Sequence, residues 1–228
     1  MSKILYIVPT PIGNLEDMTH RAVRILKEVS IVFCEDTSVT QRLFKEYAIV
    51  TKTSVFHANS TEKDFRRIID ALHEGNDVAL VSDAGMPTIS DPGVSIVKRV
   101  YEEVEGVQVV ALPGATALTT ALAVSGISSA TFTFFGFLPQ KKGRETVFGK
   151  IVENEHTSAF YESVHRIEKT LESLKDKLQD GRMVVVCKEL SKMHEEVVRG
   201  TASYVAEYFV LHKDKIRGEF VVIVEGAK

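Results

Sequence analysis

The residues best suited to chemistry lie in three turns rich in glycine and proline, each following a strand-like apolar run. The turns span residues 9–14 (PTPIGN), 82–87 (SDAGMP) and 113–117 (PGATA), and a near-copy of the second, SDPG, follows at 90–93. Small residues let a ligand approach the backbone closely, so that N–H and C=O groups can recognise it. Turns at the carboxyl ends of parallel strands are where open α/β sheets bind ligands. The three turns together therefore predict a ligand site.

Several common nucleotide, metal and hydrolase motifs are missing from the chain. No G-x-G-x-x-G follows the first strand, and the glycines at 143 and 149 have the wrong spacing for a phosphate-binding loop. Residues 194–198 read HEEVV rather than H-E-x-x-H, and no G-x-S-x-G is present. A magnesium site at Asp83 and Asp91 would lack an evident third ligand. We therefore expect no metal ion.

Short apolar runs alternate with amphipathic stretches along the chain. Continuously apolar runs are typical of strands buried on both faces, and the alternation predicts an α/β fold with mostly parallel strands. Pro113-Gly114 divides the chain into two predicted α/β domains, residues 1–114 and 115–228. The predicted strands cover 4–8, 30–34, 78–82, 107–112, 131–137, 158–162, 183–187 and 220–225, and the clearest helices cover 18–28, 62–74, 94–104, 166–178 and 201–211.

Composition and charge limit the classes of partner. The chain has 28 basic and 31 acidic residues, a net charge of −3, and 44% hydrophobic residues, which is typical of a globular protein and unlike a DNA-coating protein. Segment 106–140 has no charged residue, but Pro113-Gly114 and Gly126 interrupt it, so we expect no membrane span. Cys34 and Cys187 lie in apolar runs, which favours buried free thiols and a cytoplasmic location.

Seven segments, spread almost from end to end of the chain, carry a resemblance to a known family. They are VPTPIGNLEDMTHRAVRILKEVSIVFCEDT, LVSDAGMPTISDPG, LPGATA, FFGFLPQKKG, FYESVHR, KELSKMHEEVVRGT and GEFVVIVEG. These segments resemble the tetrapyrrole-methylase superfamily and, within it, the members that methylate a ribose 2′-oxygen of a cytidine in small-subunit (16S) ribosomal RNA. The resemblance implies a two-domain α/β homodimer that binds S-adenosylmethionine (SAM) in a cleft between its domains, with ribosomal RNA or the ribosomal particle as partner.

The resemblance also implies which residues contact the cofactor. Backbone groups of tight turns can bind the adenine and amino-acid ends of SAM without a Rossmann fingerprint. The implied cofactor contacts are Ile12, Gly13, Ser82, Asp83, Ala84, Gly85, Pro87, Thr116, Ala117, Glu162 and Leu190.

The chain departs from the superfamily pattern at a few positions. Ser38 stands where Arg usually follows EDT, and Ala58 stands in a usual H-E-H-N segment. Met86 and Val164 replace a usual Thr and Pro. The SAM turns keep their outline, so these departures concern mainly the substrate contacts around residues 36–60.

A ribose hydroxyl is a weak nucleophile, so its methylation calls for a positioned proton acceptor. Glu35 and Asp36 follow the second predicted strand, and His57 follows the run Ser-Val-Phe. These three residues are the catalytic candidates. An alternative for Asp36 is the N-cap of the helix that begins near Val39.

RNA contact calls for cations, and a compact basic loop follows FGFLPQ. Lys141, Lys142 and Arg144 belong to this loop, and Arg166 follows another predicted strand end. A solvated surface is the alternative explanation for such a charge run. Two other functions remain open from the sequence, namely a SAM methyltransferase for a tetrapyrrole-like small molecule and a non-catalytic RNA- or nucleotide-binding module.

Overall fold

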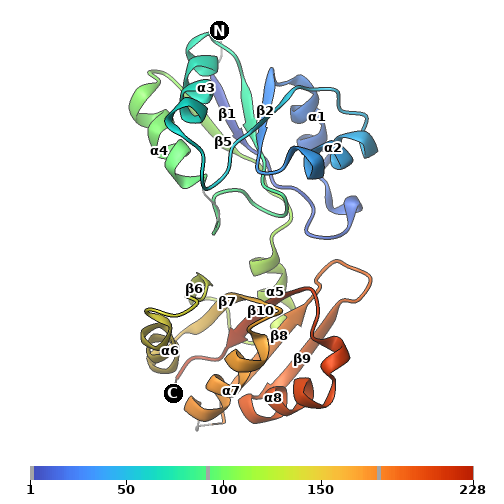
Figure 1. The fold of residues 1–228 in the computed structure, drawn as a ribbon, viewed down its shortest axis with the longest axis vertical. Coiled ribbons are helices and arrows are strands. Elements are labelled where there is room, and N and C mark those ends of the chain that lie inside the picture. The colour runs from blue at the N-terminus through green and yellow to red at the C-terminus, as the bar shows by residue number, and fades with distance from the viewer. Residues whose placement is uncertain (1–2, 91–92, 179–180, 228) are drawn as a thin grey trace. The chain divides into compact units, whose positions relative to one another are not determined.

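The computed structural model describes residues 3–90, 93–178 and 181–227. The chain forms two compact units, Met1–Thr116 (unit 1) and Ala117–Lys228 (unit 2), each built around its own sheet (Figure 1). The sequence places the division at residue 114, two residues before the end of unit 1. Asp91 and Pro92, which belong to the near-copy of the second turn, lie outside the described residues.

Unit 1 contains a five-stranded parallel sheet in the order β3-β2-β4-β1-β5, covered by helices on both faces (Figure 1). One apolar cluster packs α1 and α2 against the sheet, and a second packs α3 and α4 against the opposite face. The central strands are buried on both sides, which explains their continuously apolar sequences. The elements are β1 (Ile4–Ile7), η1 (Leu15–Asp17), α1 (His20–Glu28), β2 (Ile31–Cys34), α2 (Thr37–Glu46), β3 (Thr53–Val55), α3 (Glu62–His73), β4 (Val78–Leu80), α4 (Val94–Glu103) and β5 (Gln108–Ala111).

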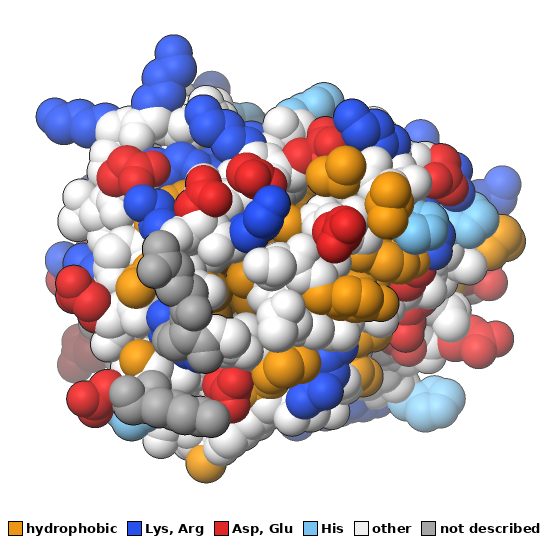
Figure 2. Space-filling view, turned by 90° about the horizontal axis from the view of Figure 1, so that it is seen from below, with side chains coloured by type: hydrophobic (Ala, Val, Ile, Leu, Met, Phe, Trp, Pro, Cys, Tyr) orange, Lys and Arg blue, Asp and Glu red, His pale blue; other side chains and the backbone are white. Residues whose placement is uncertain are grey.

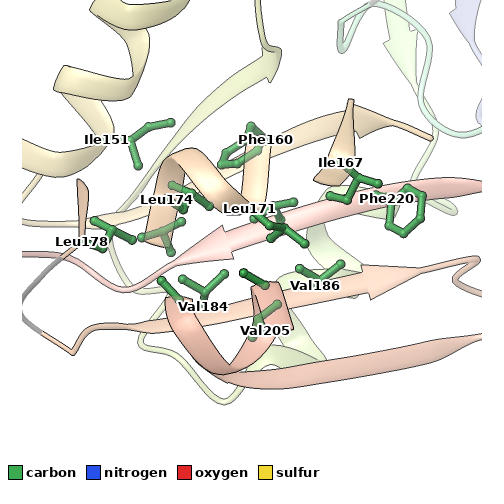
Figure 3. Packing of buried hydrophobic residues seen from close by; sticks show 14 of the residues in the cluster. Ile151, Phe160, Ile167, Leu171, Leu174, Leu178, Val184, Val186, Val205 and Phe220 are labelled. Carbon is green, nitrogen blue, oxygen red and sulfur yellow. The ribbon is translucent and has the colours of Figure 1, made fainter. Parts of the chain in front are cut away.

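Unit 2 contains a mixed five-stranded sheet in the order β6-β7-β10-β8-β9. Its main core lies where α7 and α8 pack on the sheet, with Leu171, Leu174 and Val205 against Val184 and Val186 (Figure 3). The elements are α5 (Ala117–Ser125), β6 (Phe132–Phe137), α6 (Arg144–Glu153), β7 (Thr157–Ser163), α7 (Ile167–Lys177), β8 (Met183–Lys188), β9 (Glu196–Thr201), α8 (Ala202–Leu211), η2 (Lys213–Lys215) and β10 (Glu219–Val224).

The predicted α/β class is confirmed, but the prediction of mostly parallel strands is correct only for unit 1. In unit 2 only β6 and β7 run parallel, while β10 is antiparallel to both β7 and β8, and β8 is antiparallel to β9. A continuously apolar run reports burial on both faces and carries no information on strand direction. Strands β3 and β9 were not predicted, because β3 has three residues and β9 has a single buried residue, Val198, and so no continuous apolar run.

The uncharged segment 106–140 forms β5, α5 and β6. Among the described residues, no helix has the length and apolar character needed to cross a membrane.

Candidate functional site

Two of the three predicted turns are hydrogen-bonded to each other in unit 1. The backbone N–H and C=O groups of Thr10, after β1, exchange two hydrogen bonds of 3.0 Å with those of Gly85, after β4. The Thr10 hydroxyl also donates to the carbonyl oxygen of Ser82 at 3.0 Å. Because β1 and β4 are adjacent and parallel, their carboxyl ends bring these turns together.

The third turn, after β5, approaches the same place so closely that it needs glycine. A Cβ atom added at Gly114 would lie 2.4 Å from Cγ of Pro9, well inside van der Waals contact. At Gly85, where φ is +82°, an added Cβ would lie 3.4 Å from Cγ2 of Ile12 and 3.8 Å from the carbonyl oxygen of Ala115. The predicted cofactor residues 12–13, 82–85, 87 and 116 therefore lie on neighbouring turns of one unit.

The turn after β2 is joined to the turn after β4. The Asp36 N–H donates to Oδ1 of Asp83 at 3.1 Å. Partial burial, together with the nearby negative charge of Asp36, raises the pKa of Asp83 above its ordinary value. Asp83 thus shares the edge of the sheet with the carboxylates proposed for catalysis.

Asp36 is the N-cap of α2, as the alternative explanation expected. Its Oδ1 accepts a 2.6 Å hydrogen bond from the Ser38 N–H, and the Thr40 hydroxyl donates to its backbone carbonyl. The bond from the Ser38 N–H holds the pKa of Asp36 below its ordinary value. A carboxylate committed to capping, with a lowered pKa, is a poor proton acceptor.

Glu35 and His57 lie just beyond the ends of two neighbouring strands. Cys34 in β2 pairs with Val55 in β3, so the chain continues into both residues at the same edge of the sheet. Nδ1 of His57 accepts a 3.1 Å hydrogen bond from the Asn59 N–H. In a neutral imidazole, Nε2 then carries the proton and acts as a donor.

A pocket of about 200 Å³ opens beside these turns in unit 1. Arg42 lines this pocket, although the sequence analysis did not name it. It lies one helical turn after Ser38 on α2, and this spacing is the signal that could have revealed it. Glu35 lines a separate small cavity with Phe56, Pro87 and Thr88. The larger pocket is lined by Thr10, Pro11, Gly13, Leu15, Val39, Thr40, Arg42, Leu43, Ser82 and Asp83.

In unit 2, Glu162 at the end of β7 is the centre of a buried ion cluster. Its side chain is fully buried, with Oε2 accepting from Arg144 at 3.1 Å and Oε1 pairing with Arg166 at 2.8 Å. The Thr170 hydroxyl lies 2.7 Å from Oε2, and the Ser163 N–H donates to Oε1 at 2.8 Å. Both carboxylate oxygens are therefore occupied by protein groups.

This cluster corrects the prediction that Arg144 and Arg166 bind RNA. Arg144 is buried, and its guanidinium also donates to the carbonyl oxygen of Pro139. Every guanidinium nitrogen of Arg166 has an internal partner, namely Ser163, Leu138 or Glu162. The buried Glu162 draws both cations inward, because a carboxylate without a partner would be costly there.

Lys141 and Lys142 are exposed, and their contact with RNA phosphates stays a prediction. Within the described ranges, neither lysine forms an ion pair. On the face drawn in Figure 2, by contrast, basic side chains are mixed with acidic ones and with apolar areas. A face of mixed charge does not attract a polyanion, so RNA contact calls for a local basic site.

Leu190, a predicted cofactor contact, lies in a conformationally unusual loop after β8. Its neighbours Glu189 and Ser191 have φ values of +51° and +64°, a region that non-glycine residues rarely adopt. Lys192 bridges Glu189 at 2.9 Å and Glu219 at 2.8 Å, which holds the loop in place. Local backbone strain of this kind is often found at ligand sites.

Glu162 lies near the end of β7 and Leu190 follows β8, and these two strands flank β10, since Phe220 pairs with both Glu162 and Lys188. They therefore share one edge of the unit 2 sheet. Thr116 ends unit 1, and Ala117 begins α5 in unit 2.

The part of the chain that the structure describes has no group of three or more His, Cys, Asp or Glu side chains able to hold a metal ion. Both cysteines are buried and free. Burial raises the pKa of Cys34, and it raises the pKa of Cys187 to about 12, so both thiols are protonated at neutral pH.

A family model and two solved structures show the class of protein to which this chain belongs. The family model described as Tetrapyrrole (Corrin/Porphyrin) Methylases matches residues 4–206. Among solved structures, diphthine synthase superposes with a TM-score of 0.74 at 12% identity, covering 98% of this chain and 90% of that one. A cobalt precorrin-4 methyltransferase superposes with a TM-score of 0.70 at 19% identity, covering 98% and 95%. The chain belongs to the tetrapyrrole methylase family, whose members use SAM as methyl donor.

Three relatives with higher sequence identity than these structures share the name ribosomal RNA small subunit methyltransferase I. The Bacillus subtilis (strain 168) protein is 46% identical over 225 residues, which is 98% of this chain and 75% of the relative. The Streptococcus pyogenes serotype M1 protein is 45% identical, covering 100% of this chain and 78% of the relative. The Haemophilus influenzae (strain Rd) protein is 40% identical, covering 99% and 80%. The resemblance to the tetrapyrrole-methylase superfamily, and within it to methyltransferases of small-subunit ribosomal RNA, is thereby confirmed.

Proposed function

We propose that this chain transfers the methyl group of SAM to a ribose 2′-oxygen of a cytidine in small-subunit ribosomal RNA. The observation that carries the proposal is the 46% identity, over 98% of the chain, to a relative named for methylation of that RNA. The solved structures with tetrapyrrole-related titles are less than 20% identical, so they support the fold and not a tetrapyrrole substrate.

The geometry of unit 1 fits a cofactor of this kind. Gly114 leaves no room for a side chain beside Pro9, and the buried Gly85, with its positive φ, joins the turn after β4 to Thr10 in the turn after β1. We propose that residues 12–13, 82–85, 87 and 116 of unit 1 hold the cofactor. For Ala117, Glu162 and Leu190, contact with the cofactor stays a prediction from the family resemblance. Bound SAM supplies an electrophilic methyl group.

For the chain's own part in the reaction, we propose Glu35 as the proton acceptor. Asp36 caps α2 with a lowered pKa, and His57 accepts a hydrogen bond at Nδ1, which leaves Nε2–H as a donor. His57 would then orient the ribose by donating a hydrogen bond, while Glu35 takes the proton of the attacking hydroxyl. Asp36 would hold the Asp83 side chain in position through the hydrogen bond that its backbone N–H donates to Oδ1 of Asp83 at 3.1 Å.

We further propose that Lys141 and Lys142 bind phosphates of the RNA, that the enzyme is a homodimer, and that it acts in the cytoplasm. The homodimer is supported by exposed apolar side chains in segment 106–140, such as Val124 on α5.

The test is methyl transfer from radiolabelled SAM to unmodified small-subunit RNA, presented as a transcript and as a particle. We expect label in an alkali-resistant dinucleotide, because 2′-O-methylation blocks cleavage of the adjacent phosphodiester. Glu35→Gln is the matched control for background transfer. Label in a base, or only in an added tetrapyrrole, would contradict the proposal.

A further inference from the structure

The end of β6 carries an aromatic cluster placed by a β-bulge. Phe134 pairs with Ala159, but Phe137 pairs with Tyr161, so three steps along β6 match two along β7. Gly136 lies inside this irregularity with a φ of +62°. A bulge redirects the side chains that follow it, and β6 is an edge strand whose outer side has no neighbouring strand in unit 2.

The bulge sets two phenylalanine rings against one tyrosine. The Phe134 and Tyr161 ring centroids are 5.0 Å apart, and those of Phe137 and Tyr161 are 5.3 Å apart, both edge to face. Phe137 is nevertheless 58% exposed, which is unusual for a phenylalanine in a strand. Its orientation is fixed by Tyr161, while much of its ring faces solvent.

The exposed ring leads directly into the basic loop. The two residues after Phe137 are tied down, because Arg166 donates to the carbonyl oxygen of Leu138 at 2.9 Å and Arg144 to that of Pro139 at 3.1 Å. Both arginines are in turn held by the buried Glu162. The buried ion cluster around Glu162 thus anchors the start of the loop that carries Lys141 and Lys142.

We propose that Phe137, supported by Tyr161, is a stacking platform for an unpaired base of the RNA substrate, and that Lys141 and Lys142 hold the phosphates next to it. A sequence-specific contact to RNA is usually made to unpaired bases stacked on aromatic rings, with cations along the backbone. This inference rests on the proposed function. It adds a contact by which the enzyme would select the nucleotides that flank the methylated one.

The experiment uses a short single-stranded RNA with one 2-aminopurine, whose fluorescence is quenched by stacking, titrated over a salt series. Phe137→Ala should weaken binding about 5- to 150-fold and abolish the quench, with the salt slope unchanged. Phe137→Trp should keep both. Lys142→Ala should instead lower the salt slope by about one and keep the quench.

Tyr204→Ala is the matched control, because Tyr204 is 55% exposed on α8, which packs beside β9 at the opposite edge of the sheet. It should bind RNA as the parent protein does. Parent-like affinity and quench in Phe137→Ala would overturn the platform, even if the parent methylates RNA. So would a Phe137→Ala protein that sediments at a lower mass than the parent, since the ring would then belong to a contact between two copies.

Failure of the proposed function can be distinguished from failure of the stacking platform by the methyl-transfer assay. In that case the parent protein itself transfers no methyl group to small-subunit RNA, whatever the binding of the variants.

Discussion

At the scale of single residues, Gly85 is the glycine at which two of the predicted cofactor turns are joined. Its φ of +82° disfavours any side chain, and its N–H and C=O groups are bonded to Thr10. Gly106 offers a matched comparison, because its φ is +71° but nothing lies within 4 Å of an added Cβ.

We therefore expect Gly85→Val to lose SAM binding, while Gly106→Val keeps it. Both variants should lose a similar amount of stability, about 1–3 kcal/mol, because both place a β-branched residue at a positive φ. Calorimetric titration with SAM and denaturant unfolding measure the two effects. Unchanged SAM affinity in a folded Gly85→Val would mean that this turn is purely structural.

Glu35 and Asp36 are neighbours in sequence but differ in their expected roles. Glu35→Gln should lower single-turnover methylation about 100- to 10,000-fold with little change in SAM affinity, as expected for loss of a general base. Asp36→Asn should methylate far better than Glu35→Gln, because asparagine also caps helices well. Equal losses in the two variants would contradict the assignment of Glu35 as the base.

Asp36 also predicts a pH dependence of stability. Its folded-state pKa is lowered, so its contribution is present above the pKa of an unfolded carboxyl, about 4, and is lost as the pH falls through the folded value. Asp36→Asn should remove this part of the acid destabilisation. Urea midpoints of parent and variant, compared between pH 7 and pH 3, measure it, and parallel pH profiles would contradict the expectation.

At the scale of secondary-structure elements, Glu162 joins three of them. It lies in β7, its partners Arg144 and Thr170 lie in α6 and α7, and Arg166 is the N-cap residue of α7. Through these arginines it also fixes the residues that follow β6. The cluster thus organises one edge of unit 2 through a single buried carboxylate.

Glu162→Gln should destabilise the protein by about 3–5 kcal/mol, because it leaves two buried or half-buried arginines without their counter-charge. Glu168→Gln is the control, since Glu168 is exposed on α7 and its ion pair with Lys213 is 3.8 Å long, which predicts a change of about 0.5 kcal/mol or less. Denaturant unfolding compares the two. Similar values for both would mean that the cluster adds no net stability.

At the scale of the whole molecule, the proposed homodimer depends on an apolar surface. Val124 is 46% exposed on α5, within the uncharged segment 106–140, and Val210 is 54% exposed on α8, outside it. A buried carboxylate at an interface costs several kcal/mol, whereas one on a free surface costs little. Val124→Asp should therefore shift sedimentation toward the monomer, while Val210→Asp should not. A parent protein that sediments as a monomer at micromolar concentration would remove the proposal altogether.

The sequence by itself determined most of the strands and the turns that follow them. Continuously apolar runs revealed most of the strands, because strands buried on both faces must be apolar throughout. The glycines of the turns were recognisable because close backbone approach excludes side chains, as Gly114 shows against Pro9. The segments quoted from the chain were long enough to identify its family.

Only the tertiary structure decided strand direction and the partners of the charged groups. β8 and β10 are as apolar as the parallel strands, yet they pair antiparallel, because direction follows from the connections and not from burial. Arg144 belongs to the same basic run as Lys142 but turns inward, because the buried Glu162 comes from a strand 18 residues later. Charge along the chain shows that cations are present, and only the fold decides which of them pair with an internal carboxylate and which stay exposed to solvent.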